Sequence, residues 1–346
     1  MKTQSLSILP SEAVRHGFKR ALSLAARTVG ATAPNPSVGC TLLDKDGNIL
    51  AVGAHPKAGE SHAEVVALEA ARAAGLFDKI YAALVTLEPC AHYGRTPPCA
   101  LKLKESPVKE VWIGFRDPNP LATGGGDVLT QGEPAKQVFY LEDMPDYEDL
   151  AKDCHALLMP FLTRILKKRP WLTVKQALNK NGTMYPPQGQ VTFTSPSSLK
   201  LAHQLRRATD AVITAIGTVL ADDPSFTVRH VEDHSERHAR LLIVLDRHKK
   251  MPISWKKDRE ESGFLVEACS DLEEAENLLR QYQANWALIE AGPTLLQIIK
   301  DHDFWDEWLT IQQNEGTQDD SQKLLLRDPE NGDVSPLNLL KNYGGE

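Results

Sequence analysis

Four residues give this sequence its clearest chemistry: His62 and Glu64, separated by one residue, and Cys90 and Cys99, each of which follows a proline. One imidazole and two thiolates can bind a zinc ion and leave its fourth position to a water molecule, whose pKa the ion lowers to roughly 7. Glu64 lies two residues from the histidine and is better suited to carry protons than to act as a fourth ligand. The set therefore predicts a catalytic site with one zinc ion per chain.

Each of these residues also has an ordinary structural explanation when it is taken alone. The cysteines could be buried core residues and His62 a surface residue, and the gap between the cysteines is wider than in most zinc sites. A purely structural zinc ion would need a fourth ligand, for which His92 is the nearest candidate. We expect His92 to face substrate or solvent instead, and the joint occurrence of the four residues favours the catalytic site.

The elements that would position these residues alternate between helix and strand. An alanine-rich helix is expected over 64–74, opened by His62, and strands are expected over 82–87 and 108–114. Cys90 then lies just past a strand, where a second helix could begin, and the positive end of a helix dipole favours a thiolate. The other elements of this half are a helix with Val14, Phe18, Ala21, Leu22, Ala25 and Val29 on one face and a hairpin of strands 38–43 and 49–52.

Length and composition indicate a two-domain protein that does not bind nucleic acid. A chain of 346 residues exceeds one average domain, and its 39 basic and 46 acidic side chains leave a formal charge of −7, without the basic excess of a nucleic-acid-binding protein. Five cysteines are an odd number in a long chain, so no disulfide framework is expected. The N-terminus lacks the apolar core of a signal peptide, and no later run is long enough to cross a membrane. We therefore expect a cytoplasmic protein without a membrane partner.

A domain boundary is expected where a helix following an acidic stretch ends in a basic run before Pro170. This divides the chain into domains 1–166 and 167–346. The second domain starts with a strand over 171–177, and a later helix has Ser195 as its N-cap and Pro196 in its first turn. Further apolar strands are expected over 241–245 and 286–290, the latter running into another helix.

The run TLEPCAHYGRTPPC at positions 86–99 closely resembles the deaminase half of the bifunctional deaminase–reductase family of riboflavin biosynthesis. The stretches 34–39, 53–55 and 117–120 match the same family in order, so the resemblance covers almost the whole first half. It implies a cytidine-deaminase-like fold, a three-layer α/β/α sandwich.

The resemblance also implies a substrate and roles for individual residues. The expected reaction converts 2,5-diamino-6-(5-phosphoribosylamino)pyrimidin-4-one to the corresponding uracil with loss of ammonia, and Glu64 would carry protons to the ring nitrogen and the leaving amine. Asn35 and His55 would orient the pyrimidine, while Asp117 and Asn119 would border the ribose-phosphate. The alternative for Asn35, Asp117 and Asn119 is turn chemistry, because all three neighbour prolines.

The second half resembles the reductase half of the same family in the run GTVLADDPSFTVR at 217–229 and in the turn at 290–295. The resemblance implies a dihydrofolate-reductase-like α/β fold and NADPH as cofactor. The expected cofactor-binding residues are Ala177, Thr218, Asp222, Gly292, Pro293 and Thr294, the last three in a strand-to-helix turn that would attract the cofactor phosphates.

The expected reductase substrate residues are Lys175, Arg206, Phe226, Arg229 and Glu290, the two arginines being suited to a phosphate by forked hydrogen bonding. The alternatives are exposed surface cations, a turn at 222–224, and a glutamate that only accepts hydrogen bonds from its own turn.

Several features of the reductase family are missing, and the domain looks shortened. The first strand is followed by Asn181-Gly182 instead of Asp-Gly, and Gln190–Phe193 replaces an expected Ser-x-Trp step. Residues 309–320 are polar and are expected to make a poor strand. Working reduction is therefore one interpretation, and a deaminase with a non-catalytic second domain is the alternative.

Two further alternatives come from other functional classes. A nucleic-acid-editing deaminase would share the zinc chemistry but would require a basic channel with stacking aromatic residues, of which the sequence shows no sign. A non-enzymatic scaffold would use the zinc structurally and leave Glu64 without a role. The family resemblance favours a small-molecule phosphoribosylaminopyrimidine as substrate and implies a homo-oligomer.

Overall fold

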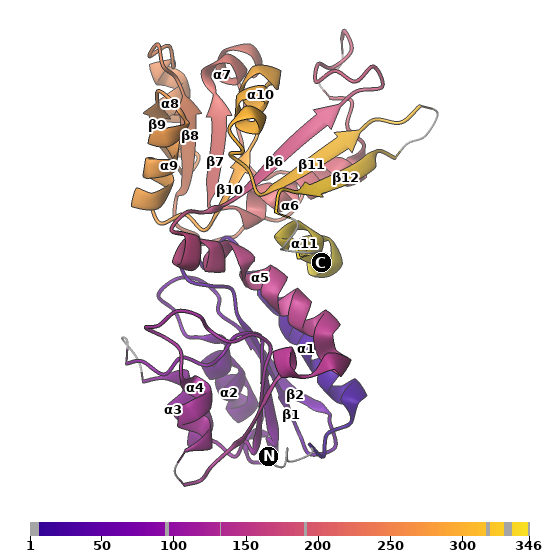
Figure 1. Cartoon of the computed structure of the whole chain (residues 1–346), viewed down its shortest axis with the longest axis vertical. Coiled ribbons are helices and arrows are strands. Elements are labelled where there is room, and N and C mark those ends of the chain that lie inside the picture. Colours follow the sequence, from indigo (N-terminus) through magenta and orange to yellow (C-terminus); the bar gives the residue numbers. More distant parts are fainter. Residues whose placement is uncertain are drawn as a thin grey trace. The chain divides into compact units, whose positions relative to one another are not determined.

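The computed structural model describes residues 7–93, 97–131, 133–189, 192–315, 319–328 and 334–344. The chain forms two compact units, one of Met1–Leu162 with Asn338–Glu346 and the other of Thr163–Leu337 (Figure 1). The sequence-based boundary between 166 and 167 lies close to this division, but the last residues of the chain group with the first unit. One contact that joins them to it is the hydroxyl of Tyr343, which donates to Asp153 Oδ2 at 2.6 Å.

The first unit alternates helices and strands. In chain order its elements are α1 (Ser11–Ala26), β1 (Gly39–Leu43), β2 (Ile49–Ala54), α2 (Ala63–Ala73), the 3₁₀ turn η1 (Phe77–Lys79), β3 (Ala82–Val85), α3 (Cys99–Lys104), β4 (Glu110–Ile113), α4 (Gly125–Thr130), β5 (Gln137–Tyr140), the 3₁₀ turns η2 (Leu141–Asp143) and η3 (Pro145–Tyr147), and α5 (Glu148–Lys167), which continues into the second unit. In the described part the strands form one sheet of order β2-β1-β3-β4-β5, in which β1 runs antiparallel to both its neighbours and β3, β4 and β5 are parallel.

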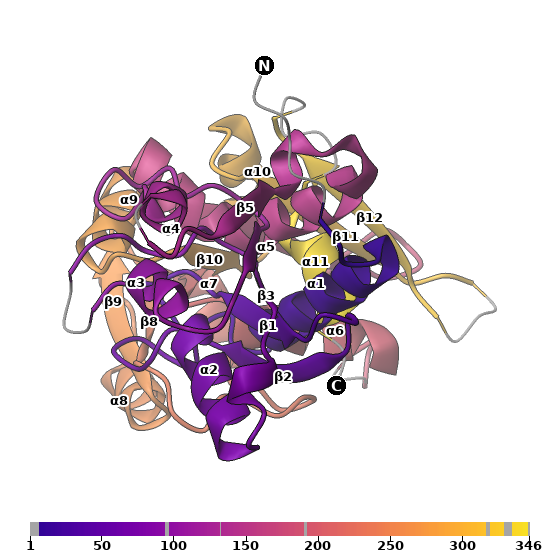
Figure 2. The ribbon, with the colours of Figure 1, turned by 90° about the horizontal axis from the view of Figure 1, so that it is seen from below.

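Strand β1 shows how this sheet is covered on both faces. Its alternate residues Cys40 and Leu42 belong to a buried cluster with the helix α2 residues Ala63 and Ala67. The opposite face of the sheet packs against α1, where Thr41 Oγ1 donates to the carbonyl oxygen of Gly17 at 2.9 Å. Because successive side chains of a strand point to opposite faces, β1 lies between α2 and α1 (Figure 2). The first unit is therefore the three-layer α/β/α sandwich that the resemblance implied.

The second unit is a larger parallel sheet with helices on both faces. Its elements are β6 (Trp171–Leu178), α6 (Pro196–Ala208), β7 (Ala211–Ala215), α7 (Ile216–Asp222), β8 (Arg240–Leu245), α8 (Ile253–Glu261), β9 (Phe264–Cys269), α9 (Leu272–Gln281), β10 (Trp286–Ile289), α10 (Pro293–Asp301), β11 (Glu307–Gln312), β12 (Ser321–Leu326) and α11 (Pro336–Tyr343), whose end belongs to the first unit. The described strands have the order β12-β11-β6-β10-β7-β8-β9, and all pairs are parallel except β11 with β12.

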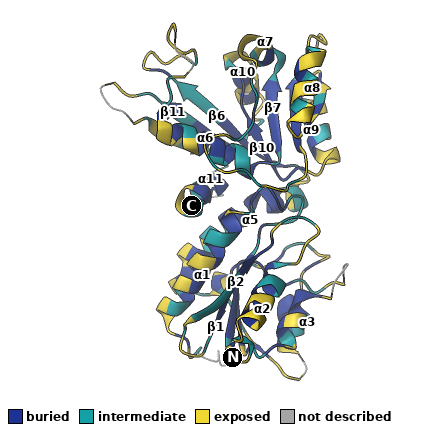
Figure 3. Cartoon of the chain, turned by 180° about the vertical axis from the view of Figure 1, so that it is seen from behind, coloured by how far each residue is buried: buried dark blue, intermediate teal, exposed yellow. Residues whose placement is uncertain are grey.

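The core of the second unit is divided by its sheet. Ile213 and Ile243 pack with residues of α9 and α10 on one face, whereas their neighbours Val212 and Leu242 pack with Trp255 of α8 on the other. Figure 3 shows β7 and β10 as buried and the outer faces of α8 and α9 as exposed. The parallel arrangement places the carboxyl ends of β7 and β10 at the same edge of the sheet, where ligands of such folds bind.

Two expectations from the sequence were wrong in detail. The helix expected to begin near Cys90 begins at Cys99, and Cys90 lies in the irregular segment that precedes it. Residues 309–312 belong to β11 despite their polar composition, because β11 pairs with both β6 and β12 and buries Leu309 and Ile311. Gly94–Thr96, Gln190, Val191 and Gly316–Gln318 lie outside the described residues. Among the helices that the structure describes, none is both long and apolar enough to span a bilayer.

Candidate functional site

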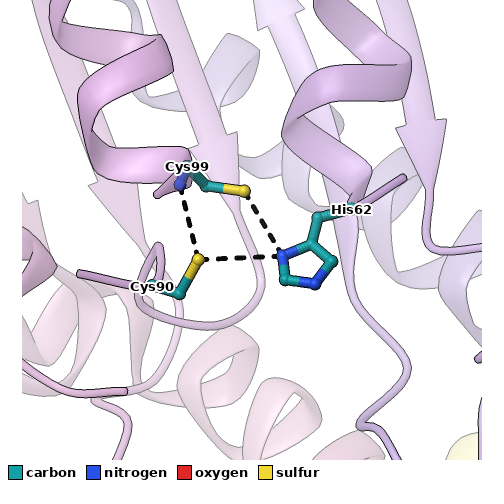
Figure 4. A group of neighbouring side chains, drawn as sticks. All are labelled: His62, Cys90 and Cys99. Carbon is teal, nitrogen blue, oxygen red and sulfur yellow. Dashed lines mark hydrogen bonds between the residues drawn. The ribbon is translucent and has the colours of Figure 1, made fainter. Parts of the chain in front are cut away.

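Three elements of the first unit bring the predicted zinc ligands together (Figure 4). His62 is the residue that precedes α2, in an extended conformation that turns the chain into the helix. Cys90 belongs to the segment that follows β3, and Cys99 is the first residue of α3. Two helix N-termini and a strand end therefore converge on one point, as expected for a site that favours negatively charged sulfur ligands.

The ligand atoms lie at distances that suit one tetrahedral zinc ion. Nδ1 of His62 lies 3.3 Å from Sγ of Cys99 and 3.8 Å from Sγ of Cys90, and all three atoms are within 4.8 Å of one another. Zinc–nitrogen and zinc–sulfur bonds of ordinary length at tetrahedral angles would place such atoms about 3.5 Å apart. His92 is not part of the group, so among the described side chains no fourth ligand closes the site.

The surroundings of Cys90 favour its thiolate form. The hydrogen bond between the two thiols, together with that from His62, lowers the pKa of Cys90 to about 4 in spite of its burial. The same contact with Cys90, and burial, raise the pKa of Cys99. The backbone N–H of Cys99 also donates to Sγ of Cys90 at 3.4 Å. This donor set is that of a zinc site with an open coordination position.

Glu64 lies on the first turn of α2 and is 3 % exposed. Burial raises the pKa of its carboxyl group, although the nearby His62 partly opposes this. A carboxyl group with a raised pKa takes up and releases protons closer to neutral pH than an exposed one does. Glu64 therefore has the environment of a general acid and base beside the three ligands.

A cavity of about 750 Å³ opens onto the cluster and is lined by Pro34, Asn35, Pro56, Ala58, Gly59, Glu60, Ser61, His62, Val66, Cys90 and His92. Its volume is in the range of small-molecule sites. The position of His92 in this lining agrees with the expectation that it faces substrate or solvent.

His55 lies behind this wall and is 3 % exposed. Its Nδ1 lies 3.1 Å from the carbonyl oxygen of Ser61, to which it can only donate, so Nε2 accepts from Nδ2 of Asn35 at 3.2 Å. Burial lowers the pKa of His55, which favours this neutral form. His55 thus fixes the orientation of Asn35, and Asn35 is the one of the two that lines the cavity.

The segment 117–120 uses its polar side chains in its own turn. Oδ1 of Asp117 accepts from the backbone N–H of Asn119 at 2.9 Å, and Oδ1 of Asn119 accepts from that of Leu121 at 3.2 Å. Neither residue is among those that line the cavity. The structure therefore gives both residues the turn role, and their contact with a ribose-phosphate stays a prediction.

In the second unit three of the predicted substrate residues, Lys175, Arg206 and Glu290, form an ion cluster around the buried carboxylate of Glu290. Oε1 of Glu290 lies 3.2 Å from Nζ of Lys175, and Oε2 accepts from Nε of Arg206 at 2.8 Å. Burial alone would raise the pKa of Glu290, but the charges of Arg206 and Lys175 lower it to about 2. Lys175 is therefore not an exposed strand lysine, and Glu290 does more than accept hydrogen bonds from its own turn.

Arg229 and Phe226 lie on the segment that follows α7. The exposed guanidinium of Arg229 donates to the hydroxyls of Ser225 and Thr227. Phe226 is buried, and the guanidinium carbon of Arg206 lies 5.9 Å from the centre of its ring. Arg206 and Phe226 are thus neighbours, and their contact with a substrate stays a prediction.

Thr218 and Gly292, two of the predicted NADPH residues, lie just past the carboxyl ends of β7 and β10. Oγ1 of Thr218 accepts from the backbone N–H of Gly292, the residue that precedes α10, at 3.1 Å. Pro293 and Thr294 are exposed on the first turn of α10, a position that attracts anions. Asp222 is exposed at the end of α7, and Ala177 lies on β6 opposite Ile311 of β11.

Two buried residues beside these sites were not selected from the sequence. Glu88 accepts backbone hydrogen bonds next to the zinc-binding segment, and Nδ1 of His203 accepts the backbone N–H of Arg229 at 2.9 Å. Glu88 lies in the loop after β3, within the run at 86–99 that predicted the site, but its hydrogen-bond partners are 29 and 38 residues further along the chain. His203 had no local signal, because its partner is 26 residues away.

Family models match both halves of the chain. Residues 12–115 match the cytidine and deoxycytidylate deaminase zinc-binding region, and residues 170–312 match the RibD C-terminal domain. The matches bear out the predicted α/β class, with a cytidine-deaminase-like first half, and the predicted pairing of a zinc-dependent with an NADPH-dependent domain.

Several proteins resemble the chain over most of its length. The riboflavin biosynthesis protein RibD of Aquifex aeolicus is 37 % identical over 289 residues, which are 82 % of this chain and 75 % of that protein. The protein of that name from Haemophilus influenzae is 40 % identical over 61 % of this chain, and the match spans 54 % of its own length.

Solved structures also resemble this chain over most of its length. RibD of Acinetobacter baumannii has a TM-score of 0.70 at 30 % identity, with 89 % of each chain covered. A diaminohydroxyphosphoribosylaminopyrimidine deaminase/5-amino-6-(5-phosphoribosylamino)uracil reductase of Thermotoga maritima has a TM-score of 0.72 at 29 % identity, again with 89 % of each chain covered.

Proposed function

The chain belongs to the RibD family of riboflavin-biosynthesis deaminase–reductases, and we propose that it carries out two successive reactions. The first is hydrolytic deamination of 2,5-diamino-6-(5-phosphoribosylamino)pyrimidin-4(3H)-one to 5-amino-6-(5-phosphoribosylamino)uracil. The second is NADPH-dependent reduction of the ribosyl to a ribityl group. We assign the first reaction to residues 1–166 and the second to residues 167–346.

The observation that supports deamination most strongly is the convergence of His62, Cys90 and Cys99 beside the buried Glu64, with His62 and Cys90 in the lining of a cavity. When bound to the three ligands, zinc acts as a Lewis acid that activates water. Glu64 would take up the two protons of the attacking water in turn and deliver one to the ring nitrogen and the other to the departing amine, which leaves as ammonia. Its raised pKa suits a group that must both accept and donate.

Substrate orientation in this proposal begins with Asn35, whose carboxamide is held by His55 at the cavity wall. A fixed amide can donate to and accept from the pyrimidine edge, so it selects one orientation of the ring. Asp117 and Asn119 are proposed to border the ribose-phosphate, in addition to the turn that they stabilise.

The reductase proposal rests on the cluster of Lys175, Arg206 and Glu290 and on the strand-to-helix turn at Gly292. Hydride transfer needs the nicotinamide held against the sugar carbon more than it needs added chemistry. The ion cluster fixes Lys175 at its position on β6, where it can approach the sugar, while Arg229 offers a guanidinium to the substrate phosphate. Thr218, Asp222 and the turn 292–294 would bind the cofactor, with Ala177 nearby on β6.

Product analysis separates this proposal from its main alternative. Purified protein is incubated with the diaminopyrimidine substrate, with and without NADPH, and the products are identified by mass spectrometry. We expect the deaminated ribosyl compound without NADPH and the ribityl compound with it. A ribosyl product under both conditions would mean that only the deaminase works, and an unchanged substrate would contradict the whole proposal.

The remaining proposals concern the cellular location and the oligomeric state of the enzyme. All five cysteines are free, which supports a reducing compartment, and we propose a cytoplasmic location. A homo-oligomer is proposed from the family resemblance, and size-exclusion chromatography with light scattering tests it.

A further inference from the structure

Glu88 is a buried carboxylate that joins its own segment, 88–91, to the segment 117–126 of the first unit. It is 6 % exposed, and its Oε1 and Oε2 accept the backbone N–H groups of Gly126 at 3.0 Å and of Asp117 at 3.2 Å. Its own backbone N–H donates to the carbonyl oxygen of Phe115 at 2.9 Å. One side chain therefore fixes both ends of the segment 117–126, and it lies two residues before Cys90 in the chain.

The same two segments are in contact at several further points. The backbone N–H of Ala91 donates to the carbonyl oxygen of Ala122 at 3.1 Å. A Cβ atom added to Gly125 would collide with the carbonyl oxygen of Pro89. The segment 88–91 thus lies directly against the segment 117–126, with no room for a side chain at Gly125.

We propose that Glu88 is a positioning residue of the deaminase site, which holds the zinc-binding Cys90 and the Asp117 segment in one fixed arrangement. The side chain of Glu88 has an oxygen on each branch, and each oxygen accepts one of the two backbone N–H groups. A glutamine of the same shape has one acceptor oxygen and one NH₂ group, which would face a backbone N–H and leave it unpaired in a buried place. The chemistry at Glu88 therefore requires a carboxylate and not merely a polar side chain.

A purely structural role would make Glu88 equivalent to other buried carboxylates of the same unit, and the chain contains a suitable one for comparison. Glu110 on β4 is fully buried and accepts from the hydroxyl of Tyr81 at 3.0 Å and from Nε1 of Trp112 at 3.0 Å. Within the described part of the chain, Glu110 makes no hydrogen bond to the segments 88–91 or 117–126. Glu110→Gln is therefore a control for the general cost of neutralising a buried carboxylate.

The test compares Glu88→Gln and Glu110→Gln in the full-length protein. Zinc affinity is measured by competition with a chromogenic chelator, deamination by ammonia release, reduction by NADPH oxidation, and stability by thermal unfolding. We expect Glu88→Gln to lower zinc affinity and deaminase kcat/KM each by roughly 10- to 100-fold and to leave NADPH oxidation unchanged. We expect Glu110→Gln to lower the unfolding temperature while zinc affinity and deaminase kcat/KM stay within about twofold of the parent.

The proposal would be overturned if folded Glu88→Gln kept the zinc affinity of the parent. It would also be overturned if Glu110→Gln lost as much zinc affinity as Glu88→Gln. If Glu88→Gln does not fold, Gly125→Ala forces the segments 88–91 and 117–126 apart at Pro89 and must also lower zinc affinity; unchanged affinity there would also overturn the proposal. The activity readout rests on the proposed function, but zinc affinity does not depend on the substrate. If the proposed substrate is wrong, Glu88→Gln should still lower zinc affinity. If the proposed role of Glu88 is wrong, zinc affinity should stay unchanged.

Discussion

The two candidate sites of this protein are built in different ways. The zinc group joins residues close in sequence, since His62 and Cys99 are 37 positions apart, and its three ligand atoms lie close enough together to hold one metal ion. The reductase cluster joins Arg206 of α6 to Glu290, which follows β10 and is 84 positions away, and Lys175 lies on β6. A site of soft metal ligands can be read from residue types and spacing, whereas a site of common charged residues exists only once the sheet has formed.

The difference extends to what each site loses when one residue is changed. In the zinc site a lost ligand removes the metal and with it the chemistry. In the reductase cluster, loss of the Glu290 charge leaves the two positive charges of Lys175 and Arg206 without their buried partner, so stability and activity should fall together.

The largest effect is expected for Cys99→Ser, which removes a thiolate ligand. Bound zinc should fall from one ion per chain towards none, and ammonia release should fall by more than about 1,000-fold, because the activated water depends on the metal. Elemental analysis and an ammonia assay measure the two quantities. NADPH oxidation with the deaminated intermediate is the control and should be retained; its parallel loss would mean that the two sites are not separate.

Glu290→Gln should affect the other half, lowering reductase kcat/KM by about 100-fold and destabilising the second unit by about 3 kcal/mol, because Lys175 and Arg206 lose their buried partner. The effect on stability should depend on pH. The pKa of Glu290 is about 2, below the ordinary value of 4.5, so its contribution is fully present above about 4.5 and disappears as pH falls towards 2.

Urea unfolding of the parent and Glu290→Gln at pH 6, 4 and 3 measures this dependence. The difference between the two proteins should shrink as the pH is lowered. A difference that is constant over this range would show that the ion cluster does not form as described.

A smaller effect tests the division of the chain. Tyr343→Phe removes the 2.6 Å hydrogen bond to Asp153 and should destabilise the first unit by about 1 kcal/mol, although Tyr343 lies near the C-terminus. Tyr282→Phe, which removes an exposed hydrogen bond to Glu267 within the second unit, is the matched control and should cost less than about 0.5 kcal/mol. Hydrogen exchange resolved by segment should place the first effect in residues 7–162; protection lost only in 163–337 would contradict the division.

The sequence predicted most of the fold because its apolar periodicity is regular. The strands at 82–85, 171–178 and 240–245 and the helix capped by Ser195 lie where the patterns indicated. The strand at 307–312 was missed because its stability comes from pairing on both edges, which composition does not reveal. The return of residues 338–346 to the first unit is equally a matter of tertiary contact.

The sequence predicted the candidate site of the first unit more fully than that of the second unit. The spacing of His62, Cys90 and Cys99 predicted a group that the structure brings together, although it did not predict that α3 begins at Cys99. The turn hydrogen bonds of Asp117 show why residue type alone could not decide between substrate contact and turn formation. The role of Glu88 depends on backbone groups far along the chain, for which the sequence has no direct signal.

Glu64→Gln is the most direct test of zinc-dependent deamination with Glu64 as proton carrier, because it keeps the shape of the side chain and removes its ability to carry protons. The parent and the variant are compared for ammonia release from the diaminopyrimidine, with zinc per chain measured on the same samples. The account predicts a loss of more than about 1,000-fold in ammonia release with one zinc ion still bound. Ammonia release within about tenfold of the parent, with zinc retained, would contradict it.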